Sequence, residues 1–445
     1  MLTFGALVTL VSQLISVSWP FHPKKFPFFY GWVIWVFSAL GFLLSVPGQT
    51  MGMAVFTDHF IEVFSLSRTE LSMAYLFGTI GSAFFLTRAG RWFDVYGGRI
   101  MVPLSAFFLG LMVLYFSFAD KFILWMDGPS WITFLVVVAG FFGVRFFGQG
   151  VLTSCSRNLL LPWFVKRRGL VSGLRNVFVS FGFSIAPLGI AGLIALFGWR
   201  ETLWGMALVV GLIFSVIALI FIRDNPASCD LAPDGEIYNP AHETSSNQSS
   251  LNLRDARRSL VFWVYSLSLA MHALFGTALT FHVVAIFSEA GLTKEIAFGY
   301  FIPVAIFSTS ANLLASWLVD SSSLKPFLIL MLGSFILGSF GFLFLDLAWG
   351  YWALASGFGV GGGLWSVVSN LAFIRFFGPN HVGEVSGFST SISVFASALG
   401  PFIFSAATDI FGSYGAAAQI CLLLLLVLLV AAIIIPQKEL SGLHR

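Results

Sequence analysis

The sequence predicts an all-α polytopic membrane protein with twelve transmembrane helices arranged as two pseudo-symmetric six-helix bundles. Three observations lead to this fold class. Hydrophobic residues make up 58% of the 445 residues and the mean hydropathy is +0.92, a composition that requires a bilayer as solvent. Long apolar runs alternate with short charged stretches, and an internal repeat relates the two halves of the chain.

A transmembrane helix needs roughly 20 consecutive, mostly apolar residues, and windows of this kind recur along the chain. We expect helices at about 30–53, 70–90, 98–118, 131–160, 168–196, 201–223, 259–288, 296–319, 325–346, 350–377, 381–410 and 414–435. The predicted parts are an N-terminal apolar or interfacial segment at 1–29, an N-terminal bundle at 30–223, a cytoplasmic linker at 224–258, a C-terminal bundle at 259–435 and a cytoplasmic tail at 436–445.

The distribution of Lys and Arg predicts the orientation, because these residues concentrate on cytoplasmic loops. With a cytoplasmic N-terminus, sixteen of the 23 fall on inside segments, four on outside loops and three in or near spans. We therefore expect both termini in the cytoplasm and the protein in the inner cell membrane. The net charge of only +3 gives no reason to expect nucleic acid as a partner.

The internal repeat connects two segments that are 214 residues apart. GLVSG at 169–173 matches GEVSG at 383–387, and the same offset relates Pro187 to Pro401 and Phe197-Gly198 to Phe411-Gly412. Parallel repeats of six helices are a known plan of secondary transporters. The repeat therefore supports two related bundles on either side of the polar linker.

The polar segment between the second and third apolar runs carries the most specific motif. Gly90, Asp94, Gly97 and Arg99 form the pattern G-x-x-x-D-x-x-G-x-R, which resembles the loop joining helices 2 and 3 in the major facilitator superfamily. Asp94 can cap the following helix, and Arg99 can pair at the cytoplasmic face. The resemblance implies a conformational latch, and the alternative is a positively charged cytoplasmic loop without a role in gating. In the second half only Asp320 matches the corresponding position.

A spaced glycine and proline pattern recurs in the predicted helices 5 and 11. Its members are Gly173, Gly182 and Pro187, and in the second half Gly387, Gly400 and Pro401. Small residues allow close helix packing and proline bends a helix. The pattern resembles an antiporter signature of the superfamily, so it has two interpretations, a structural bend or a signature of antiport.

Predicted helix 4 resembles one branch of the superfamily. Arg145 lies in the sequence RFFGQG, and the helix exits through WFVKRRG at 163–169. These residues, with Phe29-Tyr30-Gly31-Trp32 before helix 1, resemble the monocarboxylate porter and oxalate/formate antiporter branches. That branch places basic residues in helices 8 and 11, which are absent from 297–319 and 385–408 here, so a dicarboxylate is not expected.

Two residue types at predicted mid-membrane depth are candidates for solute binding or coupling. A charged arginine such as Arg145 has a high free-energy cost in a bilayer unless it faces a cavity or a partner. It therefore has two interpretations: a group that attracts an anion or switches coupling in the central cavity, or an arginine satisfied by backbone carbonyls and neighbouring helices. His272 and His282 in helix 7 can exchange protons near a pKa of about 6.5, or they serve as hydrogen-bonded packing residues. The further candidates on cavity helices are Gln49 and Asn370.

Every Asp and Glu lies near a span end or in a loop, which disfavours cationic solutes. We expect a secondary transporter, not an enzyme, that moves a small solute, a monocarboxylate-like anion, by alternating access. Proton coupling, a monomer in the bilayer, no cofactor and no metal complete the prediction. The alternatives are an exporter of hydrophobic compounds and a non-transporting membrane sensor.

Overall fold

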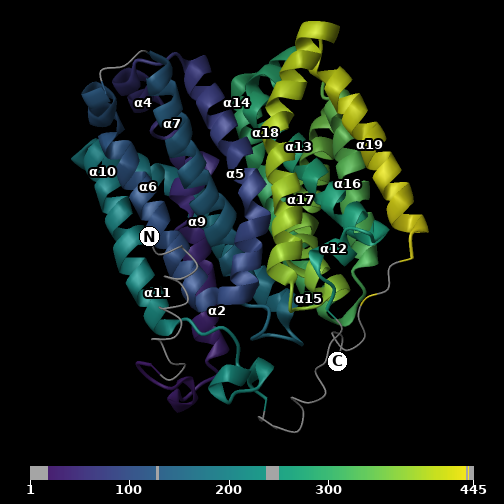
Figure 1. The fold of residues 1–445 in the computed structure, drawn as a ribbon. Helices are drawn as coiled ribbons and strands as arrows, with labels where there is room; N and C mark the ends of the chain where they lie inside the picture. The colour runs from purple at the N-terminus through teal and green to yellow at the C-terminus, as the bar shows by residue number, and fades with distance from the viewer. Residues whose placement is uncertain (1–18, 127–129, 237–249, 437–438, 440–445) are drawn as a thin grey trace. The chain divides into compact units, whose positions relative to one another are not determined.

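The computed structural model describes residues 19–126, 130–236, 250–436 and 439, and this part of the chain is helical without any strand (Figure 1). Most of the predicted N-terminal segment and the centre of the predicted linker, 237–249, lie outside the described residues. The helices can be followed in Figure 1 by their labels.

The helices before the linker carry the following bounds. They are α2 Gly31–Leu43, α3 Thr50–Ala54, α4 Thr57–Phe64, α5 Arg68–Tyr96, α6 Gly98–Met126, α7 Ser130–Val144, α8 Thr153–Asn158, α9 Arg168–Phe197, α10 Trp199–Met206 and α11 Ser215–Phe221. After it come α12 Leu253–Ala256, α13 Leu260–Glu289, α14 Lys294–Gly299, α15 Phe301–Leu318, α16 Lys325–Leu343, α17 Ala348–Phe377, α18 Val382–Phe411 and α19 Tyr414–Ile434.

The membrane-spanning pattern agrees with the sequence. Among the described residues, 11 helical segments are long and apolar enough to cross a bilayer. The remaining predicted window, 70–90, lies within α5, a continuous helix of 29 residues. The motif had suggested that Arg91 and Asp94 lie in a loop. The helix runs on to Tyr96, however, so both residues belong to its last turns.

Several predicted helices are interrupted. The window 30–53 is divided because a 3-10 segment, Val46–Gly48, contains Pro47, and proline has no N–H to continue a helical ladder. Helix 4 passes through a π-helical segment, Arg145–Leu152. The window 296–319 is divided at Tyr300 between α14 and α15. Each interruption changes which backbone groups are available to side chains.

The described chain groups into two compact units. Unit 1 consists of 1–165, 178–247 and 379–388, and unit 2 consists of 166–177, 248–378 and 389–445. In unit 1, α5 packs against α7, and in unit 2, α17 packs against both α15 and α16. Each unit thus includes a short piece from the other half of the sequence: the start of α18 belongs to unit 1 and the start of α9 to unit 2.

Local sequence signals account for the helix ends. α5 begins with a capping box, in which Glu70 N donates to Ser67 Oγ at 3.2 Å and Ser67 N donates to Glu70 Oε2 at 2.8 Å. Gly198 and Gly412 follow α9 and α18 with φ of +94° and +74°, a conformation that glycine adopts without strain. The repeat relates these two glycines, so the same stop signal ends both helices.

Candidate functional site

Arg145 lies in unit 1 at the start of the π-helical segment and is only 2% exposed. Its Nη1 donates to the Gly48 carbonyl oxygen at 3.1 Å and lies 3.4 Å from Thr50 Oγ1. The guanidinium carbon is 5.0 Å from the centre of the Tyr75 ring, within the range of a cation–π contact. The break in the first predicted helix makes this possible, because it turns the Gly48 carbonyl towards Arg145.

The guanidinium of Arg145 is only partly satisfied. Its Nε is buried and has no hydrogen-bond partner among the described residues, and no carboxylate of those residues forms a salt bridge with it. The sequence left open that Arg145 is satisfied by neighbouring helices. This holds for Nη1, which has an acceptor, but not for Nε. A buried donor without a partner carries a free-energy cost, which an acceptor on a ligand would remove.

Gln49 is not a partner of Arg145. Its Nε2 donates to Ser45 Oγ at 3.0 Å, so it stabilises the turn between α2 and α3. The polar neighbour that the structure brings to Arg145 from this segment is Thr50, whose hydroxyl also bonds to Tyr75 Oη at 2.6 Å.

His272 lies in unit 2 between two aromatic rings. It stacks on Phe335, with ring centroids 4.9 Å apart, and is tilted against Trp365 at 5.1 Å. Its Nδ1 is buried without a hydrogen-bond partner among the described residues, although the residue as a whole is only half-buried. The imidazole is therefore held by ring contacts and not by a hydrogen bond at Nδ1.

His282 has a different environment, although it lies on the same helix, α13. Its Nε2 is 3.0 Å from the carbonyl oxygen of Pro401, and its Nδ1 is 3.4 Å from Tyr414 Oη. Both ring nitrogens thus have partners, as expected for a packing residue. The two histidines have no partner in common.

Asn370 belongs to a polar network in unit 2 that also includes a residue overlooked in the sequence. Arg175 Nη2 donates to Asn370 Oδ1 at 3.0 Å and to Asn176 Oδ1 at 2.9 Å, and Asn176 Nδ2 donates to Ser366 Oγ at 2.6 Å. Arg175 is 1% exposed. A charged residue inside the long apolar run of α9 was the signal that could have identified it.

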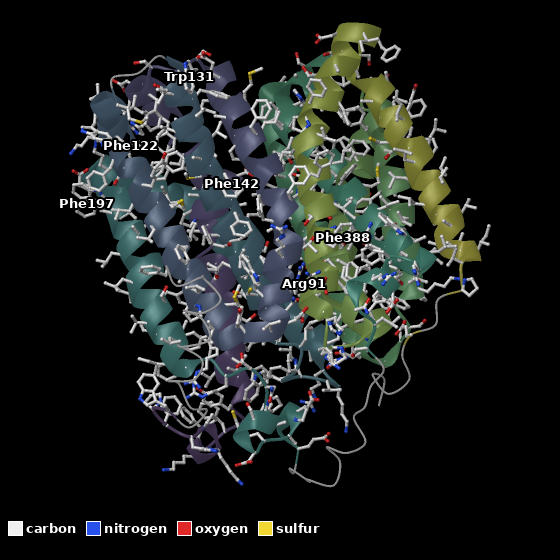
Figure 2. The ribbon with its side chains drawn as sticks, in the orientation of Figure 1. Arg91, Phe122, Trp131, Phe142, Phe197 and Phe388 are labelled. Carbon is white, nitrogen blue, oxygen red and sulfur yellow. The ribbon has the colours of Figure 1, made fainter. Side chains whose placement is uncertain are left out.

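Asp94 caps a helix far away in sequence. Its Oδ1 accepts from Gly383 N at 2.8 Å and its Oδ2 accepts from Glu384 N at 2.7 Å, so it caps the N-terminus of α18 within unit 1. The expectation that it caps the following helix, α6, is wrong. Glu384, also missed in the sequence, bonds back to α5 through Arg91, whose Nε donates to Glu384 Oε1 at 3.0 Å. Arg91 is labelled in Figure 2.

Asp320 repeats this arrangement in unit 2. Its Oδ2 accepts from Leu170 N at 3.0 Å, and its Oδ1 accepts from Gly169 N at 2.6 Å, at the N-terminus of α9. A carboxylate at a helix N-terminus is favourable because the N–H groups there have no partners within the helix. The GLVSG and GEVSG repeats are thus the two helix starts that Asp320 and Asp94 cap.

The N-terminus of α6 is capped instead by Asp224, which follows α11. Its Oδ1 accepts from Arg99 N at 2.8 Å, while the Arg99 side chain donates through Nη2 to the Trp19 carbonyl at 2.6 Å. Burial raises the pKa of the Asp224 carboxyl, although the backbone N–H of Arg99 opposes this shift. Gly97, with φ of +75°, makes the single-residue turn from α5 into α6.

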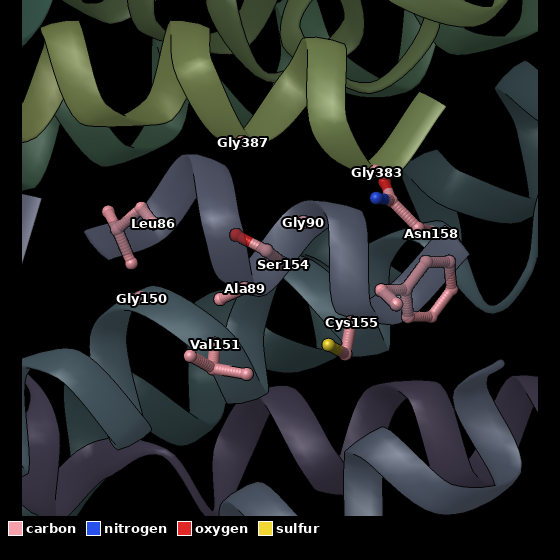
Figure 3. Close-up of a pocket in the computed structure, with 11 residues that line it drawn as sticks. Leu86, Ala89, Gly90, Gly150, Val151, Ser154, Cys155, Asn158, Gly383 and Gly387 are labelled. Carbon is pink, nitrogen blue, oxygen red and sulfur yellow. The ribbon is translucent and has the colours of Figure 1, made fainter. Parts of the chain in front are cut away.

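The predicted glycines sit at close contacts. A Cβ on Gly90 would overlap the Gly383 carbonyl oxygen, and one on Gly387 would lie 3.0 Å from the Leu86 carbonyl oxygen. Around these glycines lies a cavity of about 10 Å³ (Figure 3), room for about one water molecule. It is therefore a packing gap and not a solute site.

The other members of the glycine and proline pattern also serve packing. A Cβ on Gly173 would overlap Ser316, one on Gly182 would overlap Leu43, and one on Gly400 would overlap the Leu274 carbonyl oxygen. Pro187 and Pro401 lie inside α9 and α18. These contacts support the interpretation of the pattern as a structural one.

Comparison with known proteins identifies the architecture. Residues 38–401 match the family model described as Major Facilitator Superfamily. A probable L-galactonate transporter of Escherichia coli (strain K12) is 23% identical over 208 residues, which are 45% of this chain and 42% of that protein. The match therefore spans less than half of the relative.

Solved structures resemble the fold over nearly the whole chain. The proton:xylose symporter XylE bound to 6-bromo-6-deoxy-D-glucose has a TM-score of 0.70 at 14% identity, covering 93% of this chain and 98% of that one. The Escherichia coli fucose:proton symporter FucP has a TM-score of 0.61 at 16% identity, covering 92% and 100%. A bacterial homologue of the iron transporter ferroportin has a TM-score of 0.65 at 15% identity, covering 90% and 98%.

Proposed function

Because the chain belongs to the major facilitator superfamily, we propose that it is a secondary transporter of a small monocarboxylate-like organic anion. Transport proceeds by alternating access, in which two six-helix bundles move about a mid-membrane site. The proposed boundaries of these bundles are 30–223 and 259–435. The protein works as a monomer in the inner membrane with both termini in the cytoplasm.

The observation that carries the proposal is the incompletely satisfied guanidinium of Arg145. Among the described residues it has no acidic partner, and its Nε has no acceptor. In a medium of low dielectric constant an uncompensated positive charge attracts an anion far more strongly than it does in water. A carboxylate is the matching group because guanidinium binds it through paired hydrogen bonds.

One relative supports the same solute class. L-galactonate, the solute of the probable L-galactonate transporter, is a hydroxylated monocarboxylate. Two proteins of similar fold are proton symporters of the sugars xylose and fucose. Proton coupling is therefore part of the proposal, with a histidine of α13, His272 or His282, as the candidate group.

A thermal-shift titration of the purified protein tests the proposal. Small monocarboxylates and neutral organic solutes are compared between about pH 5.5 and 8, the range in which histidine titrates. Stabilisation by a monocarboxylate in the wild type, lost in Arg145→Ala, supports the proposed function. Arg145→Lys is the matched control, because it keeps the charge but loses the planar fork, and we expect it to retain only part of the affinity.

The alternative is an exporter of hydrophobic compounds, favoured by the aromatic walls that Phe335 and Trp365 form around His272. Stabilisation by apolar dyes that is unaffected by Arg145→Ala would favour this alternative. A counterflow assay in vesicles then separates a transporter from a sensor, because only a transporter exchanges labelled solute.

A further inference from the structure

A cavity of about 200 Å³ lies within unit 2, where the end of α13, the segment after α16 and the start of α19 meet. Its polar lining side chains are those of Glu289, Asp346, Ser413 and Tyr414. The volume is sufficient for several water molecules. In the proposed orientation the C-terminal end of α13 lies at the external face of the membrane, so solvent enters this cavity from outside.

Tyr414 connects the cavity to His282 of α13. Glu289 holds the start of α19 in place, because its Oε1 accepts from Ser413 Oγ at 2.6 Å and its Oε2 accepts from Tyr414 N at 3.3 Å. Tyr414 Oη is 3.4 Å from His282 Nδ1, and the centroids of the two rings are 5.2 Å apart. The tyrosine therefore contacts both the cavity and the imidazole.

The partners of His282 determine which ring nitrogen carries the hydrogen. A carbonyl oxygen only accepts hydrogen bonds, so Nε2 carries the hydrogen in its 3.0 Å bond to the Pro401 carbonyl. In the neutral imidazole Nδ1 then accepts from Tyr414 Oη, and in the protonated imidazole Nδ1 donates to the same oxygen, since a hydroxyl group does both. Both charge states of His282 thus keep two hydrogen bonds. His272 differs, because its buried Nδ1 has no partner among the described residues.

The second partner of His282 belongs to α18, a helix that packs on α13. Pro401 lies inside α18, where a proline removes one N–H from the helical hydrogen bonds. One turn earlier, Ser397 Oγ is 2.9 Å from Thr277 Oγ1 of α13. A hydrogen bond from a charged donor is roughly twice as strong as one from a neutral donor. Protonation of His282 therefore strengthens the contact between α13 and α18 at the proline.

We propose that His282 is a proton-binding site of the transport cycle and that it exchanges its proton with external water through Tyr414. As a hydronium ion in the cavity gives a proton to Tyr414 Oη, this oxygen gives its own proton to His282 Nδ1. The hydronium becomes water, the tyrosine stays neutral and the imidazole gains one positive charge. The charged groups that interact with Tyr414 or line the cavity are Glu289, Asp409 and Asp346, and their negative charge attracts protons to the cavity. The inference rests on the proposed function and assigns the residue and the route of proton coupling.

An NMR titration of the histidines tests the site without any solute. The full-length protein with isotope-labelled histidine is followed between about pH 5.5 and 8, the range in which imidazole titrates. The wild type is compared with His282→Gln and Tyr414→Phe. His282→Gln keeps a donor for the Pro401 carbonyl but takes up no proton, and Tyr414→Phe keeps the ring but removes the hydroxyl group.

We expect a histidine signal that titrates in the wild type, is missing in His282→Gln and no longer titrates over this range in Tyr414→Phe. The matched controls are His272→Gln, on the same helix, and Tyr351→Phe, because the Tyr351 ring packs on Phe287. Both controls should retain the titrating signal of His282. A wild-type His282 signal that does not titrate, or a titration that Tyr414→Phe leaves unchanged, overturns the inference.

Transport measurements separate this inference from the proposed function. In vesicles, accumulation of the impermeant monocarboxylate D-gluconate under a pH gradient should fall at least about tenfold in His282→Gln and Tyr414→Phe, since coupling free energies are of this size. Counterflow should continue, because exchange needs no net proton movement. Wild-type accumulation in both variants overturns the inference. If the wild type moves no D-gluconate, the anion proposal fails, and the NMR titration decides whether His282 binds protons through Tyr414.

Discussion

Asp94 Oδ1 accepts a hydrogen bond from the backbone N–H of Gly383 at 2.8 Å, across 289 residues of sequence. With the second bond from Glu384 N, the carboxylate of α5 replaces the missing intrahelical partners at the start of α18. Asp320 does the same for α9. Burial raises the pKa of the Asp94 carboxyl to about 7, while the two backbone N–H groups oppose this shift. Because both bonds end on this one side chain, we expect their loss to lower the transport rate.

Asp94→Asn should lower the transport rate at least about tenfold while the protein still folds, because hydrogen bonds to charged groups contribute about 1.5–3 kcal/mol. A loss of this size shifts a conformational equilibrium by a comparable amount. Counterflow rates and size-exclusion profiles measure the two properties. Asp320→Asn should act in the same direction, and unchanged flux in both variants would remove the latch role.

The ion pair between Arg91 and Glu384 should contribute less than the Asp94 cap. The Arg91 side chain is 62% exposed and that of Glu384 is 10% exposed, and exposed pairs typically contribute about 0.2–1 kcal/mol. A double-mutant cycle with Arg91→Ala and Glu384→Gln, followed by thermal unfolding, measures the coupling. Coupling much larger than this range would show that the pair is shielded from water in the membrane.

Asp224 predicts a specific pH dependence. Since burial raises the pKa of its carboxyl in the folded state, its contribution to stability is complete below the unfolded pKa of about 3.9 and is lost as pH rises through the folded pKa. Asp224→Asn keeps an acceptor for Arg99 N but does not titrate. We therefore expect the melting temperature of the variant, relative to that of the wild type, to increase as pH rises from about 4. If the melting temperature of Asp224→Asn stays parallel to that of the wild type over the same pH range, burial of Asp224 does not govern its titration.

In unit 2, we expect removal of Arg375 to lower the free energy of unfolding more than removal of the charge on Glu439. Arg375, which is 4% exposed, donates to the carbonyl oxygens of Val319 at 2.7 Å and Ser322 at 2.8 Å, and its Nη1 is 3.4 Å from Glu439 Oε2. Arg375→Met leaves all three acceptors without this donor and should cost about 3–5 kcal/mol. Glu439→Gln keeps an acceptor for Leu324 N and should cost about 1 kcal/mol. Denaturant unfolding measures both losses, and a larger loss in Glu439→Gln would contradict this order.

Periodicity and composition were sufficient for the helices, because a span must satisfy its backbone within itself and present apolar side chains to lipid. The predicted windows accordingly correspond to helices or to interrupted helices, and the spacing of residues from Gly90 to Arg99 was enough to indicate the superfamily. Arg175, Glu384 and Glu439 were missed as interaction partners. Nothing in their local sequence indicates which distant helix start or side chain they meet.

The sequence by itself determined the membrane class, the helix positions, the repeat and the resemblance to the superfamily, since these depend on local composition and spacing. Only the tertiary structure decided which helix each carboxylate caps, and it assigned Asp94 to α18 and Asp224 to α6. It also showed that an added Cβ would overlap neighbouring atoms at Gly361 and Gly363 of α17 but would fit at Gly362. The physical reason is that every helix start has free backbone N–H groups and every glycine lacks a Cβ, so the local sequence does not show what lies against them. Packing between segments far apart in the chain decides that.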